Sequence, residues 1–492
     1  MICISINQES RRLALVDMLN AGRSADVLEV RLDRFGKAPD VGELLQHKPK
    51  PVIMSCRRGR DGGYWEGSEA ERLAILRQCI ISKADYVEIE LDVADDIRRF
   101  PPSQRVISYT NLQETPPDIL DIYDEAKSKS PDVIKLVTLT RTPEEAWPLV
   151  QILAKATVPT VVVGLGKPGV MLALLGMRLG APWIYAALEH GMEAYPGQPT
   201  IDDLHTIYRL QDVSKQTRFV GVTGFGPREI VTVATLNAAL VQSESAYRCL
   251  PMPIGDVKVF RKVMDAAKLG AVIVDADHQQ DIVGVGVELH GPAKQTQAAD
   301  VLIHKADAWH AFDTAAATWI EALQRVLATK YSPANPFKDR FVLIVGLNAA
   351  ARTLAGEVQR RGGNAILASF RKKLGQQTAQ QLGCRFVQFE ALYSTLHDVL
   401  VICEEEKDED AKKPGGASIH AGYLKPGMVV MDLTAALAPS ALLREAAERG
   451  CLTVPPRELL FEQLEQQARL LTGKAPPRAT LEGAVPERFR EE

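Results

Sequence analysis

A single lysine in an apolar run is the residue of this chain best suited to covalent chemistry. Lys135 lies between aliphatic neighbours in the run VIKLV. A lysine that is desolvated in this way has a lowered pKa, and its free amine can attack a carbonyl carbon. The alternative is a lysine that pairs with Glu29 or Asp33 for structure alone, and the residue types by themselves leave both interpretations open.

Charged side chains alternate along an earlier run of the sequence. Glu29, Arg31 and Asp33 recur at every second position, which places them on one face of a strand. Charges that share a buried face are costly unless they pair or take part in chemistry. The next β-rich run ends at Arg57 and is followed by DGG at Asp61. These residues are therefore candidates for the same site as Lys135.

The elements that position these residues form a regular alternation. Helical patterns such as Ser68–Ser82, Pro116–Lys129 and Thr142–Ala154 separate short β-rich runs. Strands that are apolar on both faces and alternate with helices predict a parallel sheet covered by helices. Eight such units favour a closed (β/α)₈ TIM barrel over a doubly wound open sheet, and catalytic residues of such barrels lie at the C-terminal ends of the strands. The eight runs are MICISI, DVLEVRLD, PVIMSC, DYVEIELD, RVISYT, VIKLVTL, PTVVVGL and PWIYAAL.

Further α/β regions follow the barrel. We predict a barrel domain over 1–212, a second α/β domain over 218–335 with a return helix at 458–473, a Rossmann-type domain over 338–457, and a tail over 474–492. The tail is rich in Pro, Arg and Glu and is expected to be disordered. The acidic run EEEKDEDAKKPGG from Glu404 is expected to be a solvated loop.

The composition excludes several classes of protein. The chain has 492 residues, 46% of them hydrophobic and 24% charged, which is typical of globular proteins with two or three domains. A net charge of -4 gives no general attraction to nucleic acid or anionic lipid, and no apolar run is long enough to span a membrane. The first residues, MICISINQESRR, lack the order of a signal peptide, so we expect a cytoplasmic location.

The cysteines do not suggest a metal site. The seven cysteines are scattered without a C-x-x-C pair. Those at Cys3, Cys56, Cys403 and Cys451 lie in or beside apolar runs and are expected to be reduced, mostly buried thiols. We therefore expect neither disulfides nor metal ligands among them.

The barrel region carries a series of motifs in a definite order. They are E-V-R-L-D at Glu29, R-x₃-D-G-G at Arg57, S-Y ahead of a T-P, the lysine Lys135, and the closing segment YPGQPTIDDL. In this order they resemble type I 3-dehydroquinate dehydratase over residues 1–210. The resemblance implies that Lys135 forms a Schiff base with the substrate ketone, and that no cofactor is needed. It further implies that Arg57 and Gln198 hold the carboxylate or hydroxyls of 3-dehydroquinate, that Glu29 and Asp61 position the substrate and the base, and that Arg31 orients Glu29.

The barrel departs from the family pattern at two positions. Thr110, in SYTNL, stands where the family has its general-base histidine, and a hydroxyl cannot do that work near neutral pH. Ala173 stands where the family has an arginine that clamps the carboxylate. His190, in the loop after the last strand, is the candidate replacement base, and Lys167 is another candidate cation.

The second half resembles shikimate dehydrogenase over residues 219–473. The segments that carry the likeness are TLNAAL, LIVGLNAAAR, ALLREAAERGCLTV and LLFEQLEQQARLLTG. The resemblance implies a substrate contact at Gln463 and an NADP site around Gly346, with Arg371 at the position that meets the 2′-phosphate. A basic surface turn is the alternative for Arg371.

Several residues that the family uses for catalysis and cofactor binding are replaced in this half. GFGPREI replaces the paired serines of the substrate loop, His278 replaces the catalytic lysine, and Ala315 replaces the catalytic aspartate. Asp313 or Asp275 with His278 is a candidate substitute pair. Asn348 takes the place of the second glycine of G-x-G-x-x-G/A, where a side chain crowds the pyrophosphate. We expect NADP binding and dehydrogenase activity to be weak or lost.

Three functions remain as hypotheses. The first is a shikimate-pathway enzyme of aromatic amino acid biosynthesis that dehydrates 3-dehydroquinate, with an inactive second half. The second is a catalytically degenerate paralogue with a binding or regulatory role. The third is another Schiff-base barrel enzyme such as a class I aldolase, which explains Lys135 but not YPGQ or the second half. We expect a small-molecule partner, and a homodimer is left open.

Overall fold

The computed structural model describes residues 1–36, 40–404, 419–435 and 437–490. Most of the acidic run after Glu404, predicted to be a solvated loop, lies outside these residues. The chain divides into two compact units, one of Met1–Gly221 with Ala246–Leu269 and the other of Val222–Ser245 with Gly270–Glu492. No helix of the described part is long and apolar enough to cross a membrane.

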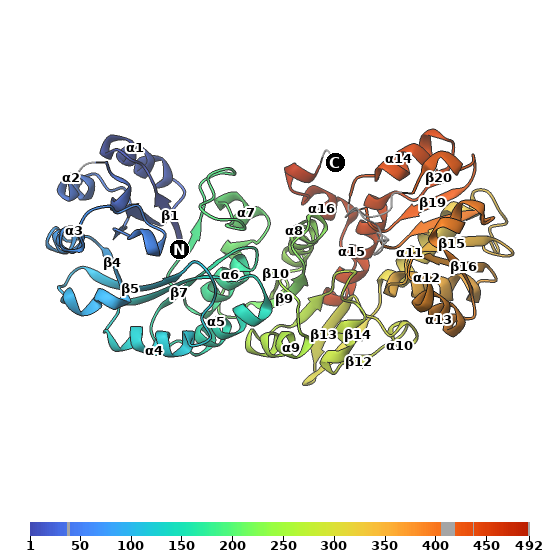
Figure 1. Ribbon diagram of the computed structural model, residues 1–492, viewed down its shortest axis with the longest axis horizontal. Coiled ribbons are helices and arrows are strands. Elements are labelled where there is room, and N and C mark those ends of the chain that lie inside the picture. The colour runs from blue at the N-terminus through green and yellow to red at the C-terminus, as the bar shows by residue number, and fades with distance from the viewer. Residues whose placement is uncertain (37–39, 405–418, 436, 491–492) are drawn as a thin grey trace. The chain divides into compact units, whose positions relative to one another are not determined.

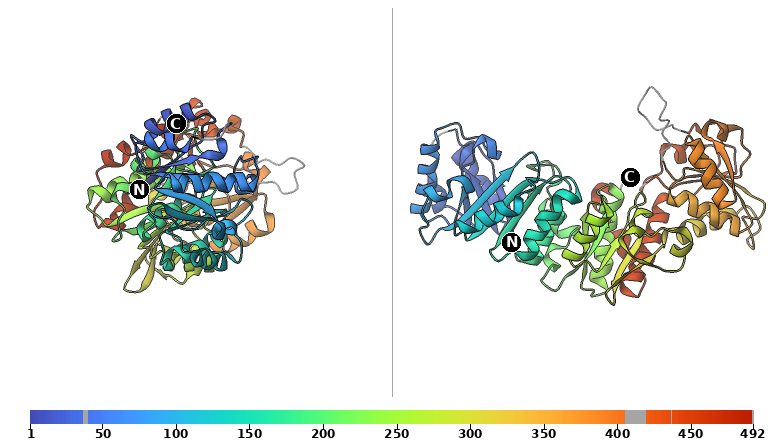
Figure 2. Two further views of the ribbon diagram at one scale, coloured as in Figure 1. Left: turned by 90° about the vertical axis from the view of Figure 1, so that its left-hand side faces the viewer. Right: turned by 60° about the horizontal axis from the view of Figure 1, so that its bottom comes forward.

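The first unit contains the predicted barrel. An eight-stranded sheet has the order β7-β6-β5-β4-β3-β2-β1-β8, and all neighbouring strands in this order pair in parallel. The strands β7 and β8 stand at the two ends of this order. The barrel is therefore nearly closed, with helices outside the strands (Figures 1 and 2). The strands are β1 (Ile2–Ile6), β2 (Val27–Arg31), β3 (Val52–Ser55), β4 (Tyr86–Glu90), β5 (Gln104–Asn111), β6 (Val133–Leu139), β7 (Thr160–Leu165) and β8 (Ile184–Ala186). The α-helices are α1 (Arg11–Ala21), α2 (Val41–Gln46), α3 (Glu69–Ile81), α4 (Ile119–Ser128), α5 (Pro143–Lys155), α6 (Gly169–Leu179) and α7 (Ile201–Thr206).

Local signals explain where the barrel helices begin. The Ser68 side chain caps α3 by accepting from the backbone N–H of Glu71, and the Glu71 carboxylate accepts from the backbone N–H of Ser68. Two backbone donors at the start of the helix are thus satisfied. Thr142 caps α5 and is followed by a proline at the first helical position, where the missing N–H costs nothing. The core of the barrel includes a cluster of buried residues, among them Val27, Ile53 and Trp183.

The next sheet mixes parallel and antiparallel pairs. Its order is β10-β9-β11-β13-β14-β12, and β14 pairs antiparallel with β13 and parallel with the edge strand β12. The strands are β9 (Arg218–Thr223), β10 (Tyr247–Met252), β11 (Ala271–Ile273), β12 (Glu288–Leu289), β13 (Val301–Lys305) and β14 (Ala308–Phe312). The accompanying helices are α8 (Pro227–Gln242), α9 (Val257–Ala266), α10 (Ala293–Thr296) and α11 (Ala315–Ala328).

The last sheet is a Rossmann-type sheet, as predicted. Its strands are all parallel in the order β17-β16-β15-β18-β19-β20, which is the 3-2-1-4-5-6 order of dinucleotide-binding folds. The strands are β15 (Phe341–Val345), β16 (Asn364–Ser369), β17 (Arg385–Gln388), β18 (Val399–Ile402), β19 (Val429–Asp432) and β20 (Leu452–Thr453). The helices are α12 (Ala349–Arg360), α13 (Lys372–Leu382), α14 (Ala441–Glu448) and the return helix α15 (Pro456–Thr472).

The tail differs from our expectation of disorder. Residues Arg478–Gly483 form the helix α16, and a single 3₁₀ turn follows at Glu487–Phe489. Leu481, Val485 and Phe489 are buried. Their four-residue spacing supplies an apolar stripe, and that stripe outweighs the polar composition on which the expectation rested.

Candidate active site

Lys135 is buried at the centre of an ion cluster inside the barrel. It lies on β6 and is only 1% exposed. Its Nζ donates to Glu88 Oε2 at 2.8 Å and lies 3.5 Å from Glu29 Oε1. The ring of Tyr185 faces the ammonium, with 4.4 Å from Nζ to the ring centroid. The lysine is thus desolvated, as predicted, but it is also held between two carboxylates.

Glu29 is fixed from several sides. Ser5 Oγ donates to its Oε2 at 2.8 Å, Ser55 Oγ donates to its Oε1 at 2.9 Å, and Arg57 forms an ion pair with it. Burial alone would raise the pKa of Glu29, but Arg57 and Lys135 hold that pKa well below its usual value. Glu29 is therefore ionised, and residues on and next to the neighbouring strands β1 and β3 hold its carboxylate in place.

Arg57 joins the cluster and keeps a donor free. Its Nη2 pairs with Glu29 and lies 3.4 Å from Glu88 Oε2. Its Nε is buried and has no hydrogen-bond partner within the described residues. A buried donor without a partner is costly, so this atom is suited to a hydroxyl or carboxylate oxygen of a bound ligand.

Arg31 does not take the role we expected. It binds Asp33 through two hydrogen bonds, from Nε at 3.0 Å and from Nη2 at 2.7 Å, and Nη2 also donates to the carbonyl of Gly62. Asp33 in turn accepts from the backbone of Tyr64. β2 ends at Arg31, and the 3₁₀ turn Leu32–Arg34 that follows brings Asp33 back to the guanidinium, so the bidentate pair forms locally. The hydroxyls of Ser5 and Ser55 hold Glu29.

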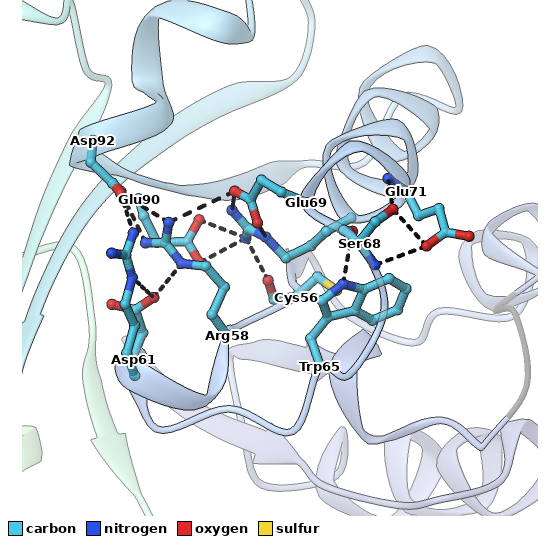
Figure 3. A network of polar contacts seen from close by, with 11 residues as sticks. Cys56, Arg58, Asp61, Trp65, Ser68, Glu69, Glu71, Glu90 and Asp92 are labelled. Atoms are coloured by element: carbon cyan, nitrogen blue, oxygen red, sulfur yellow. Dashed lines mark hydrogen bonds and ion pairs between the residues drawn. The ribbon is translucent and has the colours of Figure 1, made fainter.

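Asp61 belongs to a separate network (Figure 3). Arg58 Nε donates to Asp61 Oδ2 at 2.6 Å, and the other two nitrogens of Arg58 bind Asp92 at 2.9 Å each. Nearby, the fully buried Arg72 pairs with Glu90 at 2.7 Å. A catalytic role for Asp61 stays a prediction, because its ion pairs run to arginines at the rim rather than to Lys135.

The other predicted barrel residues lie in loops and at strand ends. His190 has a side chain that is 54% exposed, and it lies 3.3 Å from Glu193 and 3.6 Å from Asp203. Gln198 is buried, and its Oε1 accepts from the backbone of Ala194 at 2.7 Å. Both side chains thus lie in the segment that follows β8, and their roles toward substrate stay predictions.

The position of the absent base can be located from strand register. Ser108 of β5 is in register with Lys135 of β6, and Thr110 is in register with Val137. Registered partners and residues two apart point to the same face, so Thr110 shares the face of Lys135, one step nearer the C-terminal end of the strand. Ala173 lies on α6, and Lys167 is exposed at the end of β7.

Glu88 is the important residue that the sequence analysis missed. It lies on β4, two strands from Lys135, and is 4% exposed. The signal was present, because Glu88 and Glu90 alternate on one face just as Glu29 and Arg31 do. What the pattern alone did not show is which of these carboxylates meets the lysine.

The second unit holds a pocket whose lining includes two of the predicted residues, Asp275 and Gln463. Thr223, Arg228, Asp275 and Gln463 are among those that line it. Gln463 uses both ends of its amide, since its Oε1 accepts from Arg228 at 2.7 Å and its Nε2 donates to Asp300 at 2.9 Å. Burial lowers the pKa of Arg228, which has an amide rather than a carboxylate as its close partner.

The candidate substitute pair of the second half forms with Asp275. His278 Nδ1 lies 2.7 Å from Asp275 Oδ1, and this hydrogen bond raises the pKa of His278. Asp313 instead accepts from the backbone of Ala316 at the start of α11, at 3.0 Å. Burial, reinforced by Asp300, raises the pKa of Asp313 to about 6.

A carboxylate side chain lies in the predicted dinucleotide turn. Gly346 has the positive φ of 117° that such a turn requires. The Glu404 side chain, however, lies against Gly346, accepts from the backbone of Leu347 and forms an ion pair with Arg371. A carboxylate thus takes the donors that would meet cofactor phosphates. Asn348 caps α12 by accepting from Ala351 at 3.0 Å.

Comparisons with known proteins agree with this architecture. Residues 2–215 match the family model of type I 3-dehydroquinase. A 3-dehydroquinate dehydratase of Methanopyrus kandleri is 32% identical over 195 residues, covering 38% of this chain and 88% of that protein. The bifunctional 3-dehydroquinate dehydratase/shikimate dehydrogenase, chloroplastic, of Arabidopsis thaliana is 22% identical over 500 residues, covering 97% of this chain and 83% of that protein.

Among solved structures, shikimate dehydrogenase from Aquifex aeolicus is 18% identical and has a TM-score of 0.46, covering 55% of this chain and 98% of that one. The family assignment rests on the first half, where the model match and the relative from Methanopyrus kandleri agree. Through residues 2–215, this chain belongs to the type I 3-dehydroquinase family.

Proposed function

We propose that the barrel dehydrates 3-dehydroquinate through a Schiff base on Lys135, and that it does so slowly. The observation that carries this proposal is the buried cluster of Lys135, Glu29, Glu88 and Arg57. A barrel that served only as a scaffold would gain little from a buried lysine between two carboxylates, since apolar side chains of similar volume are usually at least as stabilising.

The first chemical step needs a neutral amine. Glu88 Oε2 lies 2.8 Å from Nζ and is placed to take the proton that Lys135 must lose. The amine then attacks the ketone carbon, and loss of water gives the imine. Arg57 Nε is the donor left for an oxygen of the substrate.

The second step, removal of a proton next to the imine, needs a base that this chain does not have at the family's position. An imine makes the neighbouring C–H bond acidic, and a base must remove that proton before the hydroxyl on the next carbon leaves as water. Thr110 occupies the position of the family's histidine and cannot act as that base. General-base catalysis contributes on the order of a hundred- to ten-thousand-fold to such a step. We therefore expect the imine to form readily and the removal of the proton to limit the rate of turnover.

We further propose that the second half does not act as a dehydrogenase. The support is Glu404, which is bound to the backbone of Leu347 and to Arg371 in the dinucleotide turn. His278 and Ala315 stand where the family has its lysine and aspartate, so the proton donor is missing as well.

Borohydride reduction in the presence of 3-dehydroquinate tests the barrel proposal. We expect the substrate to become attached to Lys135, found by peptide mass analysis, and Lys135→Met to remain unlabelled. Labelling at Lys167, or no labelling at saturating substrate, would contradict the Schiff base.

A binding or regulatory role is the second candidate, and Thr110 favours it. A barrel that forms the imine but cannot remove the α-proton retains its ligand instead of releasing a product. The two functions separate in one experiment, because a dehydratase releases 3-dehydroshikimate before borohydride is added, whereas a binding protein yields trapped adduct and no free product.

A further inference from the structure

Two histidines and a glutamate converge on one point at the edge of the second sheet. Glu288 lies on β12 and is in register with His310 on β14, while His290 follows β12 directly. His290 Nε2 is 2.8 Å from His310 Nδ1, and His310 Nδ1 is 3.4 Å from Glu288 Oε2. One ligand atom from each of the three residues lies within 4.8 Å of the other two. Figure 1 shows β12 and β14 side by side.

The strand pairing explains why these side chains meet. Residues in register point to the same face, as do residues two apart along a strand. Glu288, His290, His310 and Phe312 therefore occupy one face of the edge pair. The ring of His290 stacks on Phe312 with a centroid separation of 5.2 Å, which fixes the orientation of its nitrogens.

One proton on the two facing histidine nitrogens cannot give both His290 and Glu288 a good hydrogen bond to His310. If His290 Nε2 donates to His310 Nδ1, the carboxylate of Glu288 faces the same acceptor atom of His310 without a hydrogen between them. If His310 Nδ1 carries the proton, one hydrogen must serve both His290 and Glu288. A cation between the three atoms removes this conflict, because each atom then presents a lone pair to it.

We propose that Glu288, His290 and His310 bind a divalent transition metal ion, with Zn²⁺ as the natural occupant. Two imidazoles and a carboxylate form a donor set that suits zinc and leaves a coordination position for water. Zinc holds such ligands at about 2.0–2.2 Å, which places tetrahedral ligand atoms roughly 3.4 Å from one another. His310 Nδ1 and Glu288 Oε2 are already at that separation, and the two histidine nitrogens must move slightly apart to admit the ion. Glu288 is exposed and its side chain is free to turn, so it follows this adjustment without movement of the strands.

The ion joins the short edge strand to its neighbour. β12 contains only Glu288–Leu289, and a two-residue edge strand has few backbone hydrogen bonds to hold it. A metal that bridges β12 and β14 therefore fastens this edge of the sheet, and its water-filled position remains accessible from solvent.

Titration of the untagged, metal-free full-length protein with Co²⁺ tests the proposal. We expect visible d–d absorption at one equivalent of Co²⁺, and its loss when Zn²⁺ is added. Glu288→Gln and His310→Asn should each weaken the affinity by at least about a hundredfold. His304→Asn is the matched control, since His304 lies on β13 beside Trp309, on the opposite face, and should leave the titration unchanged.

The outcomes distinguish this site from others in the chain. Absence of d–d absorption in the unsubstituted protein overturns the proposal. Absorption that survives in both Glu288→Gln and His310→Asn, or that carries a thiolate charge-transfer band, assigns the metal elsewhere and overturns it equally. Glu288→Gln alters only an exposed side chain, so its result stands even where a histidine variant folds poorly.

Discussion

The residues of the barrel site form a balanced set of charges. Lys135 and Arg57 oppose Glu29 and Glu88, and all four are buried or nearly so. Removing one member leaves an uncompensated charge at a cost of about 3–5 kcal/mol, so single deletions in this cluster disturb stability as well as chemistry. Thr110 is a better place to test catalysis, because it shares the face of Lys135 but is outside the ion cluster.

Thr110→His should therefore raise the rate of dehydration. An imidazole at this position has a pKa close to neutrality and shares the face of the lysine on the neighbouring strand. We expect a gain of at least about tenfold, at the cautious end of what a positioned base contributes. The measurement is the formation of 3-dehydroshikimate, followed by its absorbance. An unchanged rate would mean that the substrate is not held as the family holds it.

His190→Ala examines the candidate replacement base. If His190 removes the α-proton in the present chain, the variant should lose turnover while imine trapping at Lys135 persists. The side chain is half exposed, so little loss of stability is expected. Turnover equal to that of the unsubstituted protein would exclude His190 and leave Asp61 or a water molecule as the base.

Asp313 should give the second unit a characteristic dependence on pH. Its pKa is about 6 in the folded chain, raised by burial and by Asp300, against 3.8 for the free side chain. The folded state thus binds the proton more tightly, so stability falls as the pH rises from about 4 to about 6 and is then constant. The loss amounts to about 3 kcal/mol.

Asp313→Asn should remove this dependence while keeping the oxygen that accepts from Ala316. Urea unfolding at several pH values measures the difference between the two proteins. We expect the variant to gain stability relative to the unsubstituted chain as the pH rises from about 4 to about 6. A constant difference across this range would contradict the raised pKa.

At the scale of elements, the periodic signals were sufficient for most of the fold. Every β-rich run of the first half forms a strand of the barrel, and α3 and α5 lie within the helical stretches predicted from Ser68 and Thr142. Among the strands that the sequence did not single out are the short strands β12, β17 and β20.

The ion cluster marks the limit of what the sequence predicts. Alternation placed Glu29 and Arg31 on an inner face, but it left open whether Arg31 pairs forward with Asp33 or back with Glu29. Likewise, only the order of the strands brings Glu88 of β4 near Lys135 of β6. Contacts of this kind depend on the closure and the register of the barrel, which no local pattern specifies.

The dinucleotide turn gives the clearest prediction for an element. Glu404→Gln removes a negative charge from the backbone of Leu347 and from Arg371. We expect NADP⁺ affinity, measured by titration calorimetry, to rise by about tenfold or more, because one surface-proximal ion pair with a hydrogen bond is worth about 1–2 kcal/mol. Glu445→Gln on α14 is a control that leaves this turn untouched.

At the scale of the whole molecule, the two halves depart from their family patterns in different ways. The barrel keeps Lys135 and the surrounding charges and has Thr110 at the position of the family's histidine. The second half keeps its sheets and its pocket, and Glu404 is bound in its dinucleotide turn.

The full-length protein should therefore fail to reduce 3-dehydroshikimate with NADPH, even when Glu404→Gln restores cofactor binding. Binding and proton transfer are separate requirements, and the substitution repairs only the first. His278 is bound to Asp275, and that hydrogen bond raises its pKa, so the imidazolium holds its proton more tightly and is a weaker general acid than a free histidine. Absorbance of the nicotinamide measures the reaction directly, and the same protein without 3-dehydroshikimate is the control. Measurable reduction by the unsubstituted chain would contradict both losses at once. Reduction by Glu404→Gln alone would show that the pair of His278 and Asp275 delivers the proton after all, and that the carboxylate in the dinucleotide turn is the single element that keeps this half inactive.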